Sequence, residues 1–380
     1  MGCAIARVQA YPLSFAVPPA QQVSLGIGRT VKRDAVLVRV DTVDGVTGWG
    51  EAHAARAPTA IAELINTTLA ALVTGLEATD TEAVWERVYR MQLASHGAGA
   101  AAVIGLSGID LALWDIKGRI ADKPVHALLG APARESPAYA GGITLGFQPP
   151  AALAVEAATY VERGFRALKL RLGDAPARDL ARVEAVRTAL GADVDILTDA
   201  NTGYDLAAYR RVADGLVAAR VGWLEEPFPA HDFISYRAAR RPDLVLAAGE
   251  NHYARFDFER AAEDAVLGVW QPDLSKCGGL TEALRIAALA IEHGIAIHPH
   301  TSLTGLNMAA SLHLLSVIPN AGYFEADCTA YNPLRDDLCA GSPVVTAAGH
   351  VAPPAGPGLG ITVDETALEH FRGIAGPGYV

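Results

Sequence analysis

The chain has 380 residues, of which 51% are hydrophobic, so it is long enough for two domains and for a large buried core. It carries 31 Lys and Arg against 42 Asp and Glu, a net charge of −11, with no basic run, which argues against nucleic acid and anionic membranes as partners. Its four cysteines form no CxxC pair or zinc spacing, and no secretory signal or membrane span is visible, so we expect a cytoplasmic protein.

The first ~130 residues predict an α+β unit, in which strands are followed by helices. Residues 35–43 alternate as a strand, Asp44-Gly45 is a hairpin turn signal, and residues 46–52 return as the partner strand. Apolar residues at three- and four-residue spacing then predict three helices, over residues 58–75, 80–92 and 97–119.

From about residue 139 the pattern becomes a strict alternation of strands and helices. The expected strands are 138–143, 167–172, 195–199, 223–226, 245–249, 269–271, 296–298 and 323–325. Helices are expected between them, for example over 151–163, 178–190, 206–219 and 281–293. Eight strands in about 190 residues predict a (β/α)₈-type barrel with its site at the carboxyl ends of the strands. A stretch rich in Pro and Gly, 352–360, looks like a return path to the N-terminal unit.

Polar residues end successive predicted strands of this barrel. They are Asp199, Glu225, Glu250, Asp273 and His300, separated by 26, 25, 23 and 27 residues. Each gap is about one strand, one helix and two short loops, so the side chains should meet at one rim of the barrel. The first three are carboxylates, which form a hard-oxygen site suited to Mg²⁺.

Several motifs resemble the enolase superfamily, in its mandelate racemase subgroup: residues 224–227 (LEEP), 249–251 (GEN), 271–279 (QPDLSKCGG) and 357–360 (PGLG). Residues 48–51 (GWGE) and 111–118 (LALWDIKG) resemble that family's N-terminal capping domain. The resemblance implies a modified TIM barrel of (β/α)₇β type with an α+β cap. We place the cap at residues 1–130, completed by about 350–380, and the barrel at 131–349.

The resemblance also implies a shared first reaction step. A Mg²⁺ ion, one per site and replaceable by Mn²⁺, binds a substrate carboxylate while a base removes the α-proton to give an enediolate. By motif position the metal ligands would be Asp199, Glu225 and Glu250. The chemistry agrees, because an α-proton of a carboxylate is too weakly acidic for a side-chain base unless the developing dianion is stabilised.

Lys169 and Arg171 lie two residues apart on the second predicted barrel strand, so both should face the barrel interior. In the family this position usually reads Lys-x-Lys, and the second lysine is a base on one face of the substrate carbon. Arg171 departs from that pattern. A guanidinium stays protonated at ordinary pH, so we expect Arg171 to act as an electrostatic clamp and Lys169 to assist or to act as an acid.

His300 and Asp273 end neighbouring predicted strands, and the resemblance pairs them as a dyad with His300 as the base on the opposite face. Asp273 would fix the tautomer of the ring and raise its basicity. His298 shares the same strand face by parity, so spacing leaves it open as a competitor or as a substrate contact. Counted from Gly294, which opens the strand, the family's histidine falls at 300.

The remaining candidates would contact the substrate. By family position Glu325, at the end of the eighth strand, would donate a hydrogen bond to the substrate carboxylate as a neutral acid. Lys276 could neutralise a distal anion or pair with a metal ligand, and Asn201 could orient a ligand or the substrate. From the cap we single out the segment 21–29 with Arg29, and His53 with Arg56.

We therefore predict a Mg²⁺-dependent enzyme that removes the α-proton of a sugar acid, an aldonate or aldarate, and eliminates water to give a 2-keto-3-deoxy acid. The alternatives are a cycloisomerase opening a lactone or anhydro-sugar acid, a racemase or epimerase of a 2-hydroxy or amino acid, and a metal-binding relative without catalysis. The expected partner is a small carboxylate substrate, and we expect a homo-oligomer.

Overall fold

The protein is described from a computed structural model, which covers residues 3–97, 99–301 and 303–380. Its N-terminal unit holds a three-stranded antiparallel sheet in the order β1-β4-β5. These strands are β1 (Ile5–Ala16), β4 (Lys32–Thr42) and β5 (Thr47–His53), and a small hairpin, β2 (Ser24–Leu25) with β3 (Gly28–Arg29), projects between the first two. The hairpin predicted around Asp44-Gly45 is thus confirmed as β4–β5.

The predicted helices of this unit are present in the structure. The first runs as α1 (Pro58–Leu64) and α2 (Ala70–Val73), joined by a π-helical turn, and the second as α3 (Thr81–Val88) and α4 (Ala94–His96), joined by another. The third is α5 (Ala100–Ala121), followed by the short α6 (Val125–Leu128). The prediction began this third helix at 97, and residue 98 lies outside the described residues.

Strand β1 was not predicted from the sequence. Pro12 lies in its middle, and a proline cannot donate a ladder hydrogen bond, which argues against a central strand. The structure tolerates Pro12 because β1 lies at an edge of the three-stranded sheet, where β4 is its only partner strand, and Leu13 additionally bridges to Arg372.

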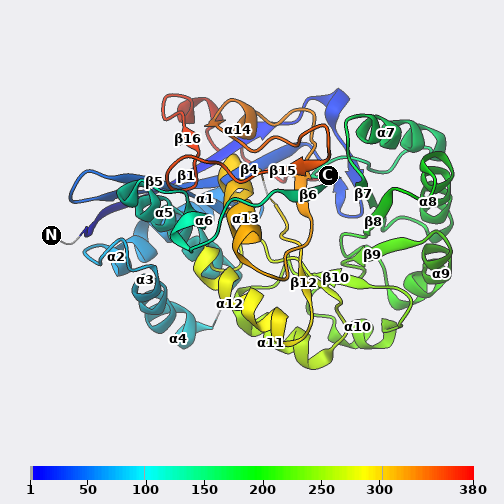
Figure 1. The fold of residues 1–380 in the computed structure, drawn as a ribbon, viewed down its shortest axis with the longest axis horizontal. Coiled ribbons are helices and arrows are strands. Elements are labelled where there is room, and N and C mark those ends of the chain that lie inside the picture. The colour runs from blue at the N-terminus through cyan, green and yellow to red at the C-terminus, as the bar shows by residue number, and fades with distance from the viewer. Residues whose placement is uncertain (1–2, 98, 302) are drawn as a thin grey trace.

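The barrel strands are parallel, and each pairs with its neighbours in chain order. They are β6 (Ser136–Gly141), β7 (Ala167–Arg171), β8 (Asp195–Asp199), β9 (Val221–Glu225), β10 (Leu246–Ala248), β11 (Val269–Trp270), β12 (Ala296–Ile297) and β13 (Phe324–Asp327). The last strand pairs back with β6, and a bridge from Ile297 to Ala321 links β12 to the segment that leads into β13. Figure 1 shows the strands curling around a common centre.

One helix follows each of the first seven barrel strands and covers the outside of the sheet (Figure 1). They are α7 (Pro150–Glu162), α8 (Pro176–Leu190), α9 (Leu206–Ala218), α10 (Phe233–Ala239), α11 (Ala254–Asp264), α12 (Gly279–Glu292) and α13 (Gly305–Val317). After β13 only the four-residue α14 (Pro333–Asp336) follows. The predicted (β/α)₇β barrel with an α+β cap is therefore confirmed. Among the described residues no helix is both long and apolar enough to cross a membrane.

The C-terminal segment returns to the N-terminal sheet. It carries the short strands β14 (Cys339–Ala340), β15 (His350–Val351) and β16 (Thr362–Val363). Its last residues then form bridges from Arg372 to Leu13 and from Tyr379 to Thr30. The return passes close to α5, where Gly358, at φ +69°, lies against Gly118, and a side chain on either glycine would collide with the other segment.

Asp115 of α5 holds this junction together. The backbone N–H groups of Trp49 in β5 and of Leu359 in the return path donate to its carboxylate at 3.0 and 2.9 Å, and Arg119 donates at 2.8 Å. The carboxylate is fully buried, so each of these donors would lose its partner without access to water.

We expect Asp115→Asn to lower the free energy of unfolding by about 1–3 kcal/mol, because an amide nitrogen cannot accept and one buried N–H is left unpaired. Urea denaturation followed by circular dichroism measures this change. The matched control is Asp214→Asn at an exposed carboxylate, which should change stability by no more than about 0.5 kcal/mol. Equal stability of the two variants would contradict the role of Asp115.

Candidate active site

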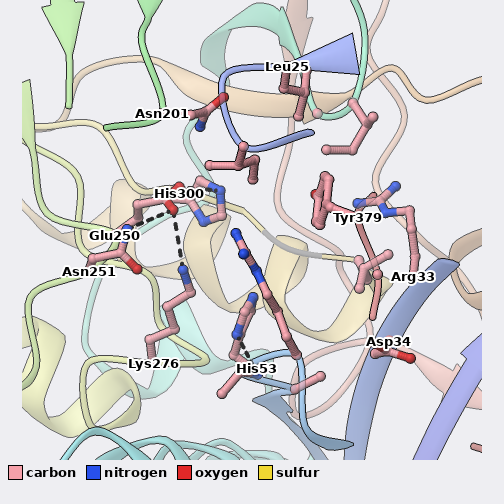
Figure 2. A pocket seen from close by; sticks show the side chains of 18 of the residues that line it. Leu25, Arg33, Asp34, His53, Asn201, Glu250, Asn251, Lys276, His300 and Tyr379 are labelled. Carbon is pink, nitrogen blue, oxygen red and sulfur yellow. Dashed lines mark hydrogen bonds and ion pairs between the residues drawn. The ribbon is translucent and has the colours of Figure 1, made fainter. Parts of the chain in front are cut away.

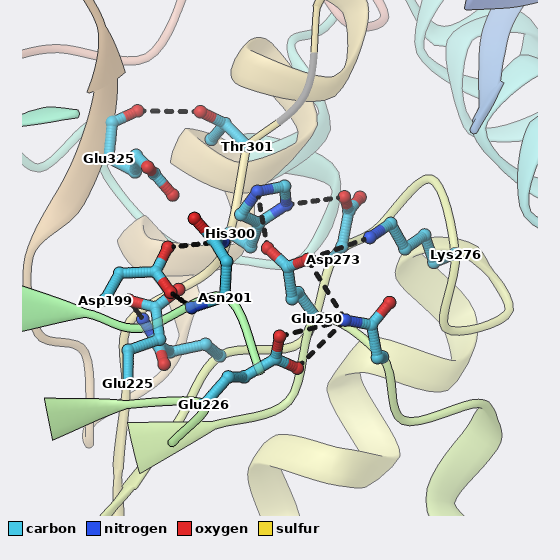
Figure 3. A network of polar contacts seen from close by, with 12 residues as sticks. Asp199, Asn201, Glu225, Glu226, Glu250, Asp273, Lys276, His300, Thr301 and Glu325 are labelled. Atoms are coloured by element: carbon cyan, nitrogen blue, oxygen red, sulfur yellow. Dashed lines mark hydrogen bonds and ion pairs between the residues drawn. The ribbon is translucent and has the colours of Figure 1, made fainter. Parts of the chain in front are cut away.

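The three predicted metal-binding carboxylates lie at the carboxyl ends of three adjacent strands. Asp199 is the last residue of β8, Glu225 the last of β9, and Glu250 follows β10 by two residues. In the sheet register Asp199 lies beside Glu225, and Glu225 beside Ala247. Figure 3 shows the three carboxylates gathered on one rim, as the regular spacing predicted.

Each of the three carboxylates contacts a basic side chain. Lys169 Nζ lies 3.1 Å from Glu225 Oε1, Arg171 donates to Asp199, and His300 Nε2 lies 2.8 Å from Glu250 Oε2. In the described ranges no three His, Cys, Asp or Glu side chains are arranged closely enough to hold a metal ion.

The donor chemistry of the site nevertheless fits a hard divalent cation. Six carboxyl groups and four basic groups meet here: Asp199, Glu225, Glu226, Glu250, Asp273 and Glu325, with Lys169, Arg171, Lys276 and His300. Burial raises the pKa of Glu225 to about 7; Lys169 opposes this rise, and the charges of Asp199 and Glu325 add to it. The site therefore holds more buried negative charge than its cations neutralise, and a divalent ion would offset the excess.

His300 and Asp273 form the predicted dyad. His300 Nδ1 lies 2.7 Å from Asp273 Oδ2, and Asp273 Oδ1 accepts from Ser275 N at 2.8 Å and from Asn307 Nδ2 at 3.0 Å. These bonds fix the carboxylate, and the carboxylate fixes the imidazole ring. Burial alone would lower the pKa of His300, but the charges of Glu250 and Glu325 and the bond to Asp273 raise it well above its ordinary value.

On β7, Lys169 and Arg171 face the inside of the barrel and are both buried. Lys169 Nζ also lies 2.9 Å from Glu325 Oε1, while Arg171 bonds to Asn201 Oδ1 at 3.3 Å and to the carbonyl of Gly142. Burial would lower the pKa of both groups, but Glu225 and Glu325 raise that of Lys169, and Asp199 raises that of Arg171. Both side chains are therefore cations in this arrangement.

Glu325 departs from the expectation of a neutral acid. Burial would raise its pKa, but the charges of Lys169, His300 and Arg171 lower it to about 2, so the group is ionised here. The prediction overlooked that Lys169 reaches Glu325 from β7, a contact between non-adjacent strands that strand spacing does not reveal.

A pocket of about 340 Å³ opens above these groups, between the barrel and the cap. From the barrel it is lined by Arg171, Asn201, Glu250, Lys276 and His300. From the cap side its lining includes Leu25, Arg33, His53, Arg56 and Tyr379. Figure 2 shows these two walls facing each other. The carboxylates Asp199, Glu225 and Glu325 lie behind this lining, so the pocket leads to them.

Two predicted substrate contacts lie away from the pocket and are corrected here. His298 is buried against Trp223, with ring centroids 5.0 Å apart, and its Nδ1 accepts from the backbone of Tyr323. Burial lowers the pKa of His298 to about 4, as expected of a neutral core histidine. Arg29 points outward and pairs with Gln22. Strand parity misplaced His298 because β12 ends at Ile297, and the local polarity that suggested Arg29 did not show that it belongs to the hairpin β2–β3.

Two residues of the site, Gln271 and Tyr379, were not predicted, whereas Asn251 was expected to orient a ligand or to contact the substrate. Gln271 donates to Glu225 Oε2 at 2.7 Å, and Asn251 donates to both oxygens of Glu226 at 2.9 and 3.0 Å. Both lie in the motifs quoted above, and Asn251 also directly follows the predicted ligand Glu250. Tyr379 reaches the pocket from the end of the chain, and no local pattern indicated that.

Comparisons with known proteins agree with this geometry. Residues 12–130 match the family described as "Mandelate racemase / muconate lactonizing enzyme, N-terminal domain", and residues 152–367 match "Enolase C-terminal domain-like". A D-galactarolactone cycloisomerase from Agrobacterium fabrum is 33% identical over 90% of this chain and 92% of its own length. An arabinonate dehydratase from Saccharolobus solfataricus is 30% identical over 89% of this chain and 91% of its own.

Solved structures give the same assignment. An enolase superfamily member from Polaromonas sp. JS666 superposes with a TM-score of 0.96 at 52% identity, covering 99% of this chain and 100% of its own. A racemase from Streptomyces coelicolor A3(2) with bound magnesium superposes with a TM-score of 0.85 at 29% identity, covering 97% and 99%. The chain therefore belongs to the enolase superfamily, in its mandelate racemase and muconate lactonizing enzyme group.

Proposed function

We propose that this protein is a Mg²⁺-dependent sugar-acid dehydratase, which removes the proton α to a carboxylate and eliminates water. The observation that carries this proposal is the asymmetry of the proton-transfer groups. His300 lies in the pocket on its dyad partner Asp273, at the end of β12. Lys169 and Arg171 lie on β7, which is separated from β12 by four strands in one direction around the ring and two in the other. Arg171 is a guanidinium that donates to Asp199 and stays protonated, and the amine of Lys169 lies 3.1 Å from Glu225 and 2.9 Å from Glu325, outside the pocket lining.

Asp199, Glu225 and Glu250 would hold the metal ion. When bound, the ion would supply positive charge to the two oxygens of the substrate carboxylate as the α-proton leaves. Arg171 lines the pocket and adds fixed positive charge for the same oxygens. Gln271 and Asn201, which donate to Glu225 and Asp199, would orient these carboxylates.

His300 would then carry the proton through both halves of the reaction. Its Nε2 accepts the α-proton, and the C–H electron pair moves into the carboxylate. The same Nε2–H next donates to the β-hydroxyl as the C–O bond breaks, so water leaves and the histidine is neutral again. The enol product becomes a 2-keto-3-deoxy acid by tautomerisation. One base is sufficient for this sequence, whereas a racemase needs a competent base on each face.

The second candidate is a cycloisomerase, which would begin with the same proton removal but expel a ring oxygen. It is favoured by the relative named D-galactarolactone cycloisomerase and by one named 3,6-anhydro-alpha-L-galactonate cycloisomerase, 30% identical over 89% of this chain. The mass of the product separates the two reactions, because only dehydration removes a water.

We expect purified protein with Mg²⁺ to convert a member of an aldonate and aldarate panel to a product lighter by one water that gives a positive 2-keto-acid assay. Mass spectrometry of the mixed reaction identifies the substrate and the reaction together. Acid-sugar lactones and anhydro acids in the same panel test the cycloisomerase. A product of unchanged mass would overturn dehydration, and no product from any acid would overturn both.

We expect Mg²⁺ to bind more weakly as the pH falls below about 7, because Glu225 must lose its proton to act as a ligand. The dissociation constant from calorimetric titration should rise between pH 8 and pH 6, by at most about tenfold per unit from this one group. Glu225→Gln should weaken binding at every pH, whereas Glu263→Gln, at an exposed glutamate outside the site, should not. Equal Mg²⁺ affinity of the Glu225→Gln variant and the wild type would contradict the ligand assignment.

We expect His300→Asn to lower kcat by about 10²–10⁴-fold and to abolish exchange of the α-proton with D₂O, because the base is lost. The exposed His293→Asn variant is the matched control and should keep full activity. Melting temperatures of both variants show whether they are folded. A folded His300→Asn protein that still exchanges the α-proton would show that another group is the base.

A further inference from the structure

A strained turn follows β5 at the mouth of the pocket. Ala55 and Arg56 both have left-handed backbones, with φ of 47° and 59°, and the N–H of Ala57 donates to the carbonyl of Ala54 at 2.8 Å. Two successive positive φ values inside such a hydrogen bond resemble a type I′ turn, which Asn-Gly normally fills. A side chain with a Cβ is disfavoured in this conformation. The arginine thus occupies a backbone conformation that suits glycine or asparagine better, and the contacts of its side chain suggest a use for it.

Arg56 extends from this turn into the pocket. Its guanidinium carbon lies 5.0 Å from the centroid of the Tyr379 ring, and both residues line the cavity. Within the described ranges, no carboxylate lies within ion-pair distance of Arg56. Stacking on a ring occupies the face of a guanidinium, while its N–H groups point outward in the plane. Tyr379 thus fixes the group and leaves its hydrogen-bonding edges available.

The other cations of this wall are already compensated. Lys32 lies 3.1 Å from Asp34 and donates to a backbone carbonyl. Arg33 donates to Thr329 Oγ1 at 3.1 Å and lies 3.6 Å from Asp327, a longer and weaker contact. Figure 2 shows Arg33 beside Tyr379, across the pocket from Glu250 and His300. Arg56 is therefore the cation of this wall without an anionic partner, and Arg33 lies on the same side of the cavity.

We propose that Arg56, stacked on Tyr379 and assisted by Arg33, binds a second carboxylate at the end of the substrate remote from the reacting carbon. The substrate class is then the aldarates, sugar acids with a carboxylate at both ends. A planar guanidinium can donate two parallel hydrogen bonds to the two oxygens of a carboxylate. A terminal CH₂OH group offers the guanidinium only one neutral hydroxyl as a partner. This proposal rests on the proposed function, which accounts for the carboxylate next to the reacting carbon.

The test measures binding of matched acids that differ only at the far end, with Mg²⁺ present and His300→Asn as the common background so that nothing is turned over. The calorimetric probes are galactarate with galactonate, and glucarate with gluconate. Arg56→Met removes the guanidinium group and keeps a long unbranched side chain, and Arg56→Lys keeps the positive charge without the planar guanidinium. Arg90→Met is the control, at an exposed arginine paired with Glu86.

We expect one diacid to bind at least about tenfold more tightly than its monoacid partner. Arg56→Met should reduce this ratio to about one, mainly by weakening the binding of the diacid, Arg56→Lys should reduce it in part, and Arg90→Met should leave it intact. A ratio unchanged in Arg56→Met, diacids that bind no better than monoacids, or no binding of any diacid would each overturn the proposal. Tighter binding of 6-phosphogluconate than of glucarate would also overturn it, in favour of a phosphate.

These outcomes are distinct from failure of the proposed function. If wild-type protein dehydrates no sugar acid, the catalytic assignment fails, yet the ratio of diacid to monoacid binding still decides the role of Arg56. If the wild type dehydrates aldonates as efficiently as the matched aldarates, the function stands and the second carboxylate site does not.

Discussion

The central constraint on this structure is a cluster of buried carboxylates at the carboxyl ends of neighbouring barrel strands. Parallel strands of a barrel all end at one rim, so an acid at the end of each of three neighbours becomes a cluster of carboxylates. Burial and mutual repulsion oppose ionisation of such a cluster, as the raised pKa of Glu225 shows. Lys169, Arg171, Lys276 and His300 offset part of this charge, and a divalent cation would offset more.

The same cluster explains why the two sides of the pocket differ chemically. The carboxylates pair with Lys169 and Arg171 on β7, where these cations can stabilise an anion. On the other side Asp273 orients an imidazole, the side chain best suited to exchange protons near neutral pH. One charged wall and one proton-transfer group are what an elimination through a single base requires. The arginine at position 171, where the family usually has lysine, belongs to this asymmetry.

The sequence predicted the barrel closely because short buried parallel strands that alternate with helices leave a strong periodic signal. Strand β8 was predicted with its observed bounds, and the row of carboxylates followed from the spacing of strand ends, whereas the pairing of His300 with Asp273 was expected from the family resemblance. The sequence pattern was weaker for β1, because Pro12 within this edge strand is a residue more typical of loops.

Long-range contacts could not be read from the sequence. The ionised state of Glu325 depends on Lys169, which lies 156 residues earlier in the chain (325 − 169), and the pocket needs Tyr379 from the C-terminal return. The positions of His298 and Arg29 were predicted from strand parity and local polarity, which do not show where a strand stops.

The most direct test of the single-base account is the configuration at the α-carbon of substrate recovered from a partly converted reaction in D₂O. NMR of the recovered acid reports both deuterium content and configuration. The account predicts that the recovered substrate keeps its original configuration, whether or not it has exchanged its α-proton. Recovery of the deuterated epimer would contradict it, because a second competent base would then have to act from the side of Lys169 and Arg171.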